Sequence, residues 1–322
     1  MGYRIIYSVV VPIFNEELVI LESYKRLKEV MDMTNEEYEL VFVNDGSIDS
    51  TRKKVELICE KDDRVKLVNF SRNFGHQAAI TAGMNVAIGH AIVVIDADLQ
   101  DPPEVILQMI EKWKQGYEVV YGKRAKREGE TFFKKFTSSM YYRVLRGMTN
   151  VDVPVDVGDF RLIDRKVCDA LASLPEKSRY VRGLVSWVGF KQTYVEFVRH
   201  ERFAGETKYP LNKMIKLALD GITSLSYKPL GIITYVGSLF SIIGVIASII
   251  VITKNLISGT HILSLGLILS LNIIMFGIAF LSHGIMGQYV ARIFEETKER
   301  PVYIIDNIVN YKQQAIQRKK VN

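Results

Sequence analysis

Residues 92–103 have the sequence Ile-Val-Val-Ile-Asp-Ala-Asp-Leu-Gln-Asp-Pro-Pro. An apolar run of strand length ends in two carboxylates, Asp96 and Asp98, and the prolines at 102 and 103 then turn the backbone away. Because alternate residues of an extended chain point the same way, both carboxylates can converge on one object. In an open α/β sheet, ligands bind at the carboxyl ends of the strands. A divalent cation carrying a diphosphate would explain two like charges there, and an acidic turn that caps the next helix is the alternative.

Apolar strands alternate with helical stretches through residues 1–125. Because these strands are apolar throughout and helices separate them, we expect an α/β fold of Rossmann-like type, with a mostly parallel sheet covered by helices on both faces. Pro12 is expected to stop the first strand, so that the residues after it can face a ligand. The expected strands are 9–11, 40–43, 65–70 and 91–95, and the expected helices are 16–33, 50–60 and 76–87.

Two long stretches without charge follow the α/β region. Residues 230–252 and 262–291 contain no Asp, Glu, Lys or Arg. At about 1.5 Å per residue, each is long enough to cross a hydrocarbon core of about 30 Å, so we expect two transmembrane helices. A buried helical hairpin in a soluble core is the alternative. Basic residues flank the pair, whereas the link 253–261 carries only Lys254, and this bias places both termini in the cytoplasm.

The expected plan of the 322-residue chain has four parts. They are a cytoplasmic α/β domain (1–209), an interfacial amphipathic helix (210–228), a transmembrane hairpin (229–291) and a cytoplasmic C-terminal tail (292–322). The apolar stripe of the second part suits the membrane interface and docking on the sheet domain equally. A homo-oligomer through the transmembrane helices would be compatible with this plan.

The net charge of +6 favours an anionic partner. With two spans expected, that partner is the lipid bilayer or a phosphorylated lipid, and no RNA-binding signature or zinc-finger spacing supports nucleic acid. The N-terminus lacks the pattern of a secretory signal. Cys59 and Cys168 form neither a disulfide framework nor a metal-binding spacing.

We call residues 96–101 the acidic turn, and further motifs accompany it. In chain order the motifs are Val11-Pro12-Ile13-Phe14-Asn15-Glu16, Asn44-Asp45-Gly46-Ser47 with Asp49 and Thr51, Asp96-Ala97-Asp98, and Gly122-Lys123-Arg124. Together they resemble the motif set of family 2 inverting glycosyltransferases of the GT-A fold. Residues 71–77 and 99–103 and the paired C-terminal spans are similar to the polyprenyl-phosphate members, which include bactoprenol glucosyltransferases and dolichol-phosphate mannose synthases. The resemblance covers about residues 5–292 and implies a nucleotide sugar donor and a polyprenyl phosphate acceptor.

The donor side is expected at the ends of the first strands. An N-cap pair for the next helix is the alternative at residues 15 and 16, and a simple turn is the alternative at 45–47. Residues 73–75 precede a helix whose N-terminus could favour a diphosphate. The candidate nucleotide-sugar residues are Pro12, Asn15, Glu16, Asp45, Asp96 and Ala97.

Asp98 and Gln100 are the candidate ligands of Mg²⁺ or Mn²⁺, which prefer hard oxygen donors. Such a cation would neutralise the departing diphosphate, so Asp98 counts as catalytic and no general acid is needed. The resemblance puts the second catalytic candidate, Asp159, near the anomeric carbon. Because a lipid phosphate is largely ionised near pH 7, with a second pKa of about 6, we interpret Asp159 as positioning acceptor or sugar. The family suggests a general base there, and a pair with Arg161 is the structural alternative.

Arg124, Arg202 and Lys208 are the expected ligands of the lipid phosphate. Residues 202–209 resemble the family loop that closes over the site. The histidines, among them His76, have no partners at ligand spacing and are expected to be structural or exposed.

Two departures from the family pattern bear on the activity. Phe14 stands where many relatives carry tyrosine, and the Gln-x-x-Arg-Trp signature of polymerising relatives is absent. The sequence therefore predicts a membrane-anchored enzyme that moves a single hexose, with glucose from UDP-glucose the first choice, to undecaprenyl phosphate on the cytoplasmic face of the cell membrane, for cell-envelope glycosylation. Another donor (GDP-mannose, UDP-GlcNAc), another acceptor, a dolichyl carrier or a non-enzymatic nucleotide-sensing subunit are the alternatives.

Overall fold

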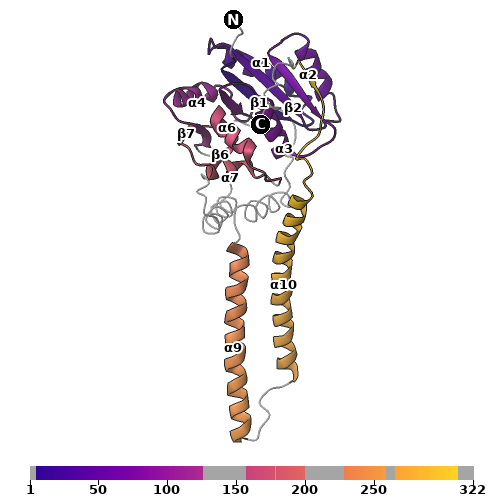
Figure 1. Ribbon diagram of the computed structural model, residues 1–322, viewed down its shortest axis with the longest axis vertical. Helices are drawn as coiled ribbons and strands as arrows, with labels where there is room; N and C mark the ends of the chain where they lie inside the picture. Colours follow the sequence, from indigo (N-terminus) through magenta and orange to yellow (C-terminus); the bar gives the residue numbers. More distant parts are fainter. Residues whose placement is uncertain (1–4, 126–156, 178, 200–227, 259–264, 311–322) are drawn as a thin grey trace.

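The computed structural model describes residues 5–125, 157–177, 179–199, 228–258 and 265–310. An α/β domain stands above two long helices (Figure 1). Its strands are β1 (Tyr7–Ile13), β2 (Tyr38–Asn44), β3 (Val65–Phe70), β4 (Ala91–Val94), β5 (Val119–Arg124), β6 (Val157–Asp164), β7 (Gln192–Phe197) and β8 (Ile305–Val309). Its helices are α1 (Ile20–Asp32), α2 (Thr51–Cys59), α3 (His76–Val86), α4 (Val105–Lys114), α6 (Arg165–Ser173) and α7 (Val181–Trp187), and the long helices are α9 (Lys228–Ser258) and α10 (Leu265–Thr297).

The eight strands form one sheet in the order β7-β5-β6-β4-β1-β2-β3-β8. The pairs β4–β1, β1–β2, β2–β3 and β5–β7 are parallel, which agrees with the expected mostly parallel sheet. The antiparallel members, β6 and β8, were not predicted. Because β4, β1 and β2 lie side by side and parallel, the loops that follow them meet at one edge of the sheet.

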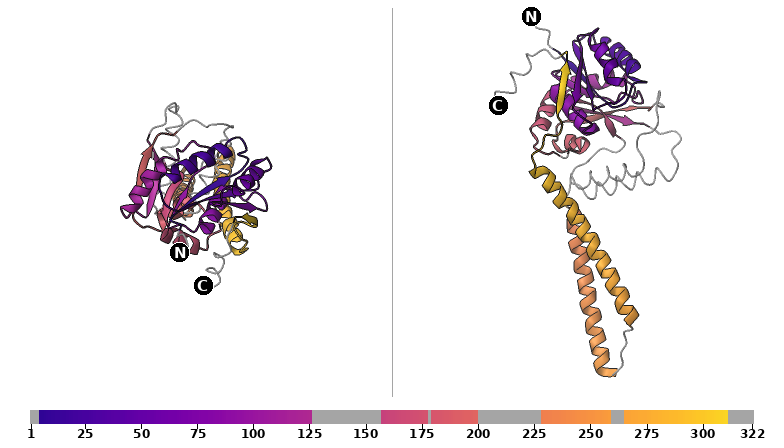
Figure 2. Two further views of the ribbon diagram at one scale, coloured as in Figure 1. Left: turned by 90° about the horizontal axis from the view of Figure 1, so that it is seen from above. Right: turned by 90° about the vertical axis from the view of Figure 1, so that its right-hand side faces the viewer.

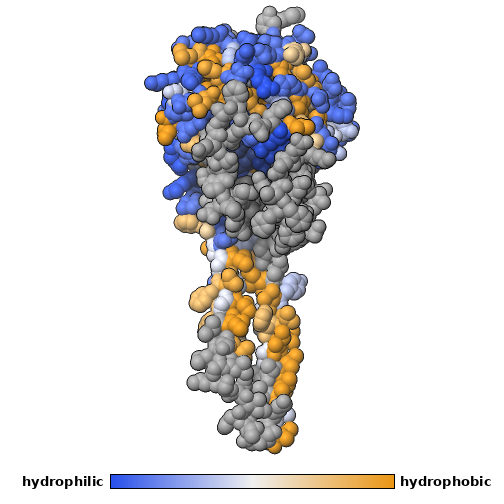
Figure 3. Space-filling model, turned by 180° about the vertical axis from the view of Figure 1, so that it is seen from behind, coloured by the Kyte–Doolittle hydropathy of each residue, from blue (hydrophilic) through white to orange (hydrophobic). Residues whose placement is uncertain are grey.

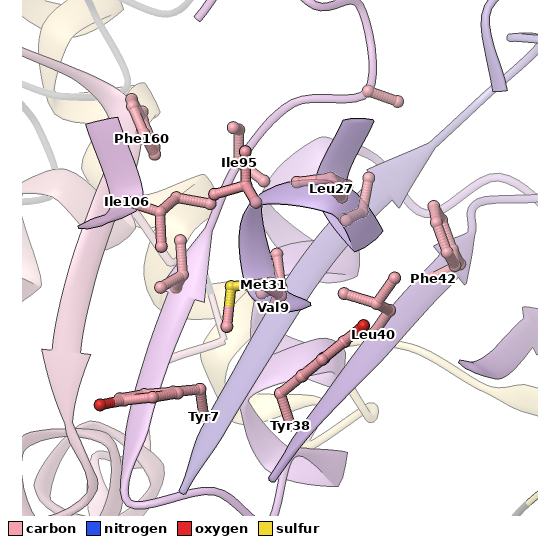
Figure 4. Packing of buried hydrophobic residues seen from close by; sticks show 14 of the residues in the cluster. Tyr7, Val9, Leu27, Met31, Tyr38, Leu40, Phe42, Ile95, Ile106 and Phe160 are labelled. Carbon is pink, nitrogen blue, oxygen red and sulfur yellow. The ribbon is translucent and has the colours of Figure 1, made fainter. Parts of the chain in front are cut away.

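Helices cover both faces of the sheet, as expected. One buried cluster joins α1, α2 and α4 to one face, and a second joins α3, α6 and α7 to the other. In the first cluster Leu27 and Met31 of α1 pack with Val9 of β1 (Figure 4). The side chains of β1 are buried on both faces, which explains why this strand is apolar at nearly every position.

The first strand does not stop at Pro12, so that expectation is wrong. β1 continues to Ile13, and Pro12 pairs with Val43 of β2. The carbonyl of Val10 accepts a hydrogen bond from Ile95 N at 3.1 Å, so the even-numbered backbone groups of β1 face β4. β4 ends at Val94, so the strand pairing between β1 and β4 has ended where the nitrogen of Pro12 faces that side. A proline at this position therefore removes no hydrogen bond of the β1–β4 pairing.

The two long helices lie side by side below the domain (Figure 2). Among the described residues, one segment, Ile274–Thr297 of α10, is long and apolar enough to cross a membrane. Hydrophilic residues dominate the domain, and hydrophobic residues dominate the described parts of both helices (Figure 3). The second span stays a prediction, and residues 210–227 of the expected interfacial helix lie outside the described residues.

After α10 the chain returns to the sheet of the α/β domain. β8 pairs antiparallel with β3 and forms one edge of the sheet (Figure 2). Part of the segment expected as a tail is therefore a strand of the α/β domain. Such pairing between distant segments leaves no local signal in the sequence.

Candidate active site

The loops after β1 and β2 are held together by hydrogen bonds. Asn15 N donates to Ser47 Oγ at 3.0 Å, and Ile48 N donates to Asn15 Oδ1 at 2.9 Å. Asn15 has a φ of 54°, a left-handed conformation that asparagine tolerates better than most residues. Glu16 N donates to Thr51 Oγ1 at 2.8 Å. The contacts of Asn15 and Glu16 with a base and ribose stay predictions, but the loops that carry them are fixed relative to each other.

Asp45 connects the loop after β2 to the start of α3. Its carboxylate is buried and accepts hydrogen bonds from Phe74 N at 2.6 Å and Gly75 N at 2.9 Å. Burial raises the pKa of Asp45, and these N–H groups oppose the rise. Gly46 has a φ of 69°, and a Cβ there would lie 2.7 Å from the carbonyl carbon of Arg72. Only glycine allows the two loops to pack so closely, and Asp45 anchors that contact.

The acidic turn after β4 has an uncommon backbone. Leu99, between Asp98 and Gln100, has a φ of 57°, which is costly for a bulky side chain and is typical of functional sites. Gln100 N donates to Asp98 Oδ1 at 3.1 Å. Asp96 Oδ1 is buried, and no described group donates a hydrogen bond to it. The turn therefore contains one buried carboxylate oxygen, Asp96 Oδ1, that receives no hydrogen bond from the described residues.

Asp159 lies on β6, not in a loop, and is bound on several sides. Arg182 of α7 donates to it from Nε and from its terminal nitrogen, both at 2.9 Å. Arg161 donates at 3.3 Å. Burial favours the protonated carboxyl, but Arg182 and His76 outweigh it and hold the pKa of Asp159 well below its usual range. Asp159 is therefore a stable anion and a weak base.

His76, the first residue of α3, belongs to the same cluster, where it has partners that its sequence neighbours did not indicate. Its Nε2 lies 3.5 Å from Asp96 Oδ1 and 3.3 Å from Asp159 Oδ2. Burial disfavours protonation, but the charges of Asp96 and Asp159 raise the pKa of His76 to about 9. A protonated imidazole therefore connects the acidic turn to β6 at neutral pH.

Arg182 and Gln77 were missed as members of this site. Gln77 Oε1 accepts from Val181 N at 3.1 Å, and its amide nitrogen lies 3.5 Å from Asp159 Oδ2. Gln77 falls within the residue 71–77 motif, which could have suggested it, whereas no pattern in the sequence marks Arg182.

A pair of arginines lies beside the acidic turn. Arg124, at the end of β5, and Arg199 approach the same oxygen of the buried Asp101, at 3.8 and 3.5 Å. Burial raises the pKa of Asp101 to about 6. Of the three residues expected to bind the lipid phosphate, Arg124 thus lies next to the acidic turn, and Arg202 and Lys208 lie outside the described residues.

The described part of the chain contains no group of three or more His, Cys, Asp or Glu side chains that could hold a metal ion alone. Asp98 and Gln100 would supply two side-chain oxygens. This set fits Mg²⁺ bound through one or two carboxylates together with substrate phosphates better than it fits a cage made by the protein.

Comparisons with known proteins identify the family. Residues 8–172 match the profile of Glycosyl transferase family 2. The chain belongs to this family. The glycosyltransferase is 59% identical over 308 residues to an uncharacterized glycosyltransferase, YkcC, of Bacillus subtilis, covering 95% of this chain and 94% of that one. The family membership and the mostly parallel sheet establish the GT-A α/β fold.

Other relatives have names that include a substrate. The glycosyltransferase is 40% identical over 301 residues to the prophage bactoprenol glucosyl transferase homolog of Escherichia coli, covering 94% of this chain and 98% of the relative. It is 38% identical over 300 residues to the bactoprenol glucosyl transferase of Shigella phage SfV, covering 93% and 98%. Among solved structures, glucosyl-3-phosphoglycerate synthase from Mycobacterium tuberculosis in complex with UDP is similar with a TM-score of 0.48 and 20% identity, over 68% of this chain and 79% of that one.

Proposed function

We propose that this glycosyltransferase moves one glucose from UDP-glucose to undecaprenyl phosphate at the cytoplasmic face of the cell membrane. The observation that carries the proposal is the convergence of three features at one edge of the sheet. They are the acidic turn, Asp159 with its partners His76, Gln77 and Arg182, and Arg124. The names of relatives that cover nearly the whole chain support bactoprenol as the acceptor and glucose as the sugar.

The donor binds along the loops after β1, β2 and β4. Asn15, Glu16 and Asp45 face the base and ribose, and Asp96 with Ala97 lies on the nucleotide side. Asp98 and Gln100 hold Mg²⁺ or Mn²⁺. When bound, such a cation supplies Lewis-acid neutralisation of the charge that develops on the leaving diphosphate.

The acceptor needs no strong base. Its phosphate is largely ionised near pH 7, and Asp159, with its lowered pKa, is poorly suited to take a proton. The anion of Asp159 is fixed by Arg182 and His76 and serves to orient the sugar and the incoming phosphate. Arg124, together with Arg202 and Lys208, binds the lipid phosphate, whose oxygen attacks the anomeric carbon in line.

The membrane anchor keeps acceptor and site at one interface. The apolar segment of α10 supports one span, and α9 is the proposed second span. Because β8 follows α10 and pairs with β3, the C-terminal end of α10 lies on the same side of the membrane as the catalytic domain in this proposal. Such an arrangement is what two cytoplasmic termini require.

A transfer assay tests the proposal. The purified full chain in detergent is incubated with radiolabelled UDP-glucose, undecaprenyl phosphate and Mg²⁺, and the lipid is extracted into chloroform. We expect extractable label that depends on the lipid phosphate and on the metal. Parallel reactions with GDP-mannose, UDP-GlcNAc, dolichyl phosphate and diacylglycerol identify another donor or acceptor, and no extractable label in any reaction would refute the proposal.

A further inference from the structure

Three asparagine side chains form a row from β8 to the loop after β2. Ser47 N donates to Asn44 Oδ1 at 3.0 Å, Asn44 Nδ2 donates to Asn69 Oδ1 at 2.9 Å, and Asn69 Nδ2 donates to Asn307 Oδ1 at 2.8 Å. The row crosses β2, β3 and β8 and ends at the loop that also binds Asn15. It joins the strand that follows the long helix α10 to the expected donor site.

The direction of these hydrogen bonds is set at one end. A backbone N–H can only donate, so Asn44 must present its oxygen to Ser47 and its amide nitrogen to Asn69. Asn69 must then accept from Asn44 and donate onward. Asn307 therefore has to offer an acceptor, and its oxygen completes the hydrogen bonding of Asn69 at the other end of the row.

Burial makes this dependence costly to break. Asn69 is fully buried and Asn44 is 2% exposed, whereas Asn307 is exposed. A buried amide N–H without an acceptor loses more free energy than one ordinary hydrogen bond contributes. Without an acceptor at position 307, the Asn69 amide N–H would lose its partner, and Asn69 would shift in search of another acceptor and weaken its hydrogen bond with Asn44.

The segment between α10 and β8 also contacts the end of β3, through the ring of Tyr303. The ring of Tyr303 stacks on Phe70 with 5.2 Å between centroids, and Phe70 meets Phe74 edge to face at 5.7 Å. Phe74 N is a donor to Asp45. The segment after α10 is thus connected to two candidate donor residues. The asparagine row leads to the loop at Ser47, which binds Asn15, and the aromatic contacts lead to Phe74, which binds Asp45.

We propose that Asn307 is a positioning residue for the donor nucleotide: as the terminal acceptor of the row, it fixes Asn69 and Asn44 and thereby the loop at Ser47. This inference rests on the proposed function, because the donor loop is its target. Asn307 acts through other residues and is not expected to contact the substrate. A merely structural role at the sheet edge would change stability alone.

The test compares three variants of the full chain. Asn307→Leu removes the acceptor, Asn307→Asp keeps an oxygen acceptor at the same place, and Asp306→Ala is the matched control on the same strand, where the exposed Asp306 lies 3.5 Å from Arg52. The KM for UDP-glucose, the KM for undecaprenyl phosphate, kcat and the thermal unfolding midpoint are measured for each, and UDP binding is measured by calorimetry.

We expect Asn307→Leu to raise the KM for UDP-glucose and the Kd for UDP about fivefold, as the loss of one hydrogen bond implies, with little change in the lipid KM. Asn307→Asp should recover most of the lost affinity, and Asp306→Ala should match the wild type. Equal effects of Leu and Asp, equal changes in both KM values, or a lower unfolding midpoint without a change in UDP affinity would overturn the inference. A wild-type chain that neither binds UDP nor transfers sugar would instead refute the proposed function, and the inference with it.

Discussion

Replacing Arg182 should destabilise the catalytic domain, because Arg182 balances a buried carboxylate. Asp159 is 5% exposed and receives two hydrogen bonds of 2.9 Å from Arg182. Removal of one partner of a buried ion pair costs about 3–5 kcal/mol. Since Arg161 and His76 stay within 3.3 Å of Asp159, we expect Arg182→Leu to cost about 3 kcal/mol, at the low end of that range.

Arg182→Lys keeps the charge but loses the two-pronged geometry, so its cost should be about 1.5 kcal/mol, near that of one charged hydrogen bond. For a domain of this size, about 3 kcal/mol lowers the unfolding midpoint by about 6–12 °C. The assay is thermal unfolding of the purified full chain in detergent, with Arg26→Leu as the control, because Arg26 pairs with Glu104 at the surface. A drop below about 2 °C for Arg182→Leu, or equal drops for Leu and Lys, would refute this reasoning.

Three further predictions follow from the site. The folded-state pKa of His76, about 9, is above its unfolded value, so the stability that His76 contributes is fully present below about pH 6.5 and is lost as the pH rises through 9. The difference in unfolding midpoint between the wild type and His76→Gln should therefore shrink over that interval. A constant difference would contradict the ion bridge. Gly46→Ala should cost about 1–2 kcal/mol in backbone strain and weaken UDP binding through its clash with Arg72, whereas Gly116→Ala, with a φ of 89° and no atom within 4 Å, should bind UDP normally; normal binding by both would count against the loop contact. Asp98→Asn should raise the Mg²⁺ concentration needed for UDP binding about tenfold or more, and an unchanged Mg²⁺ dependence would exclude Asp98 as a ligand.

The central part of the fold could be predicted from the sequence because its signals are local. Apolar runs followed by polar turns located β1 to β4 within a few residues, and the abrupt change at Asp96 marked the candidate ligand site. Burial on both faces is what makes these strands apolar, so the pattern is a direct consequence of the parallel sheet.

The rest depends on contacts between distant segments. His76 has no partner nearby in the sequence, and its role emerges only when β4 and β6 bring Asp96 and Asp159 to it. Arg182 lies in a helix without any motif and reaches Asp159 through the packing of α7. The pairing of β8 with β3 brings residues 305–309 beside residues 65–70, and short strands of mixed polarity such as β8 carry little signal of their own.

The stereochemistry of the product tests the central claim most directly, because a single in-line attack by the lipid phosphate must invert the anomeric carbon. UDP-glucose is an α-glycoside, so the lipid extracted after reaction should carry a β-linked glucosyl phosphate, as read from the anomeric proton coupling in its NMR spectrum. An α-linked product would require a second displacement or a different nucleophile and would contradict the site proposed around Asp98, Asp159 and Arg124.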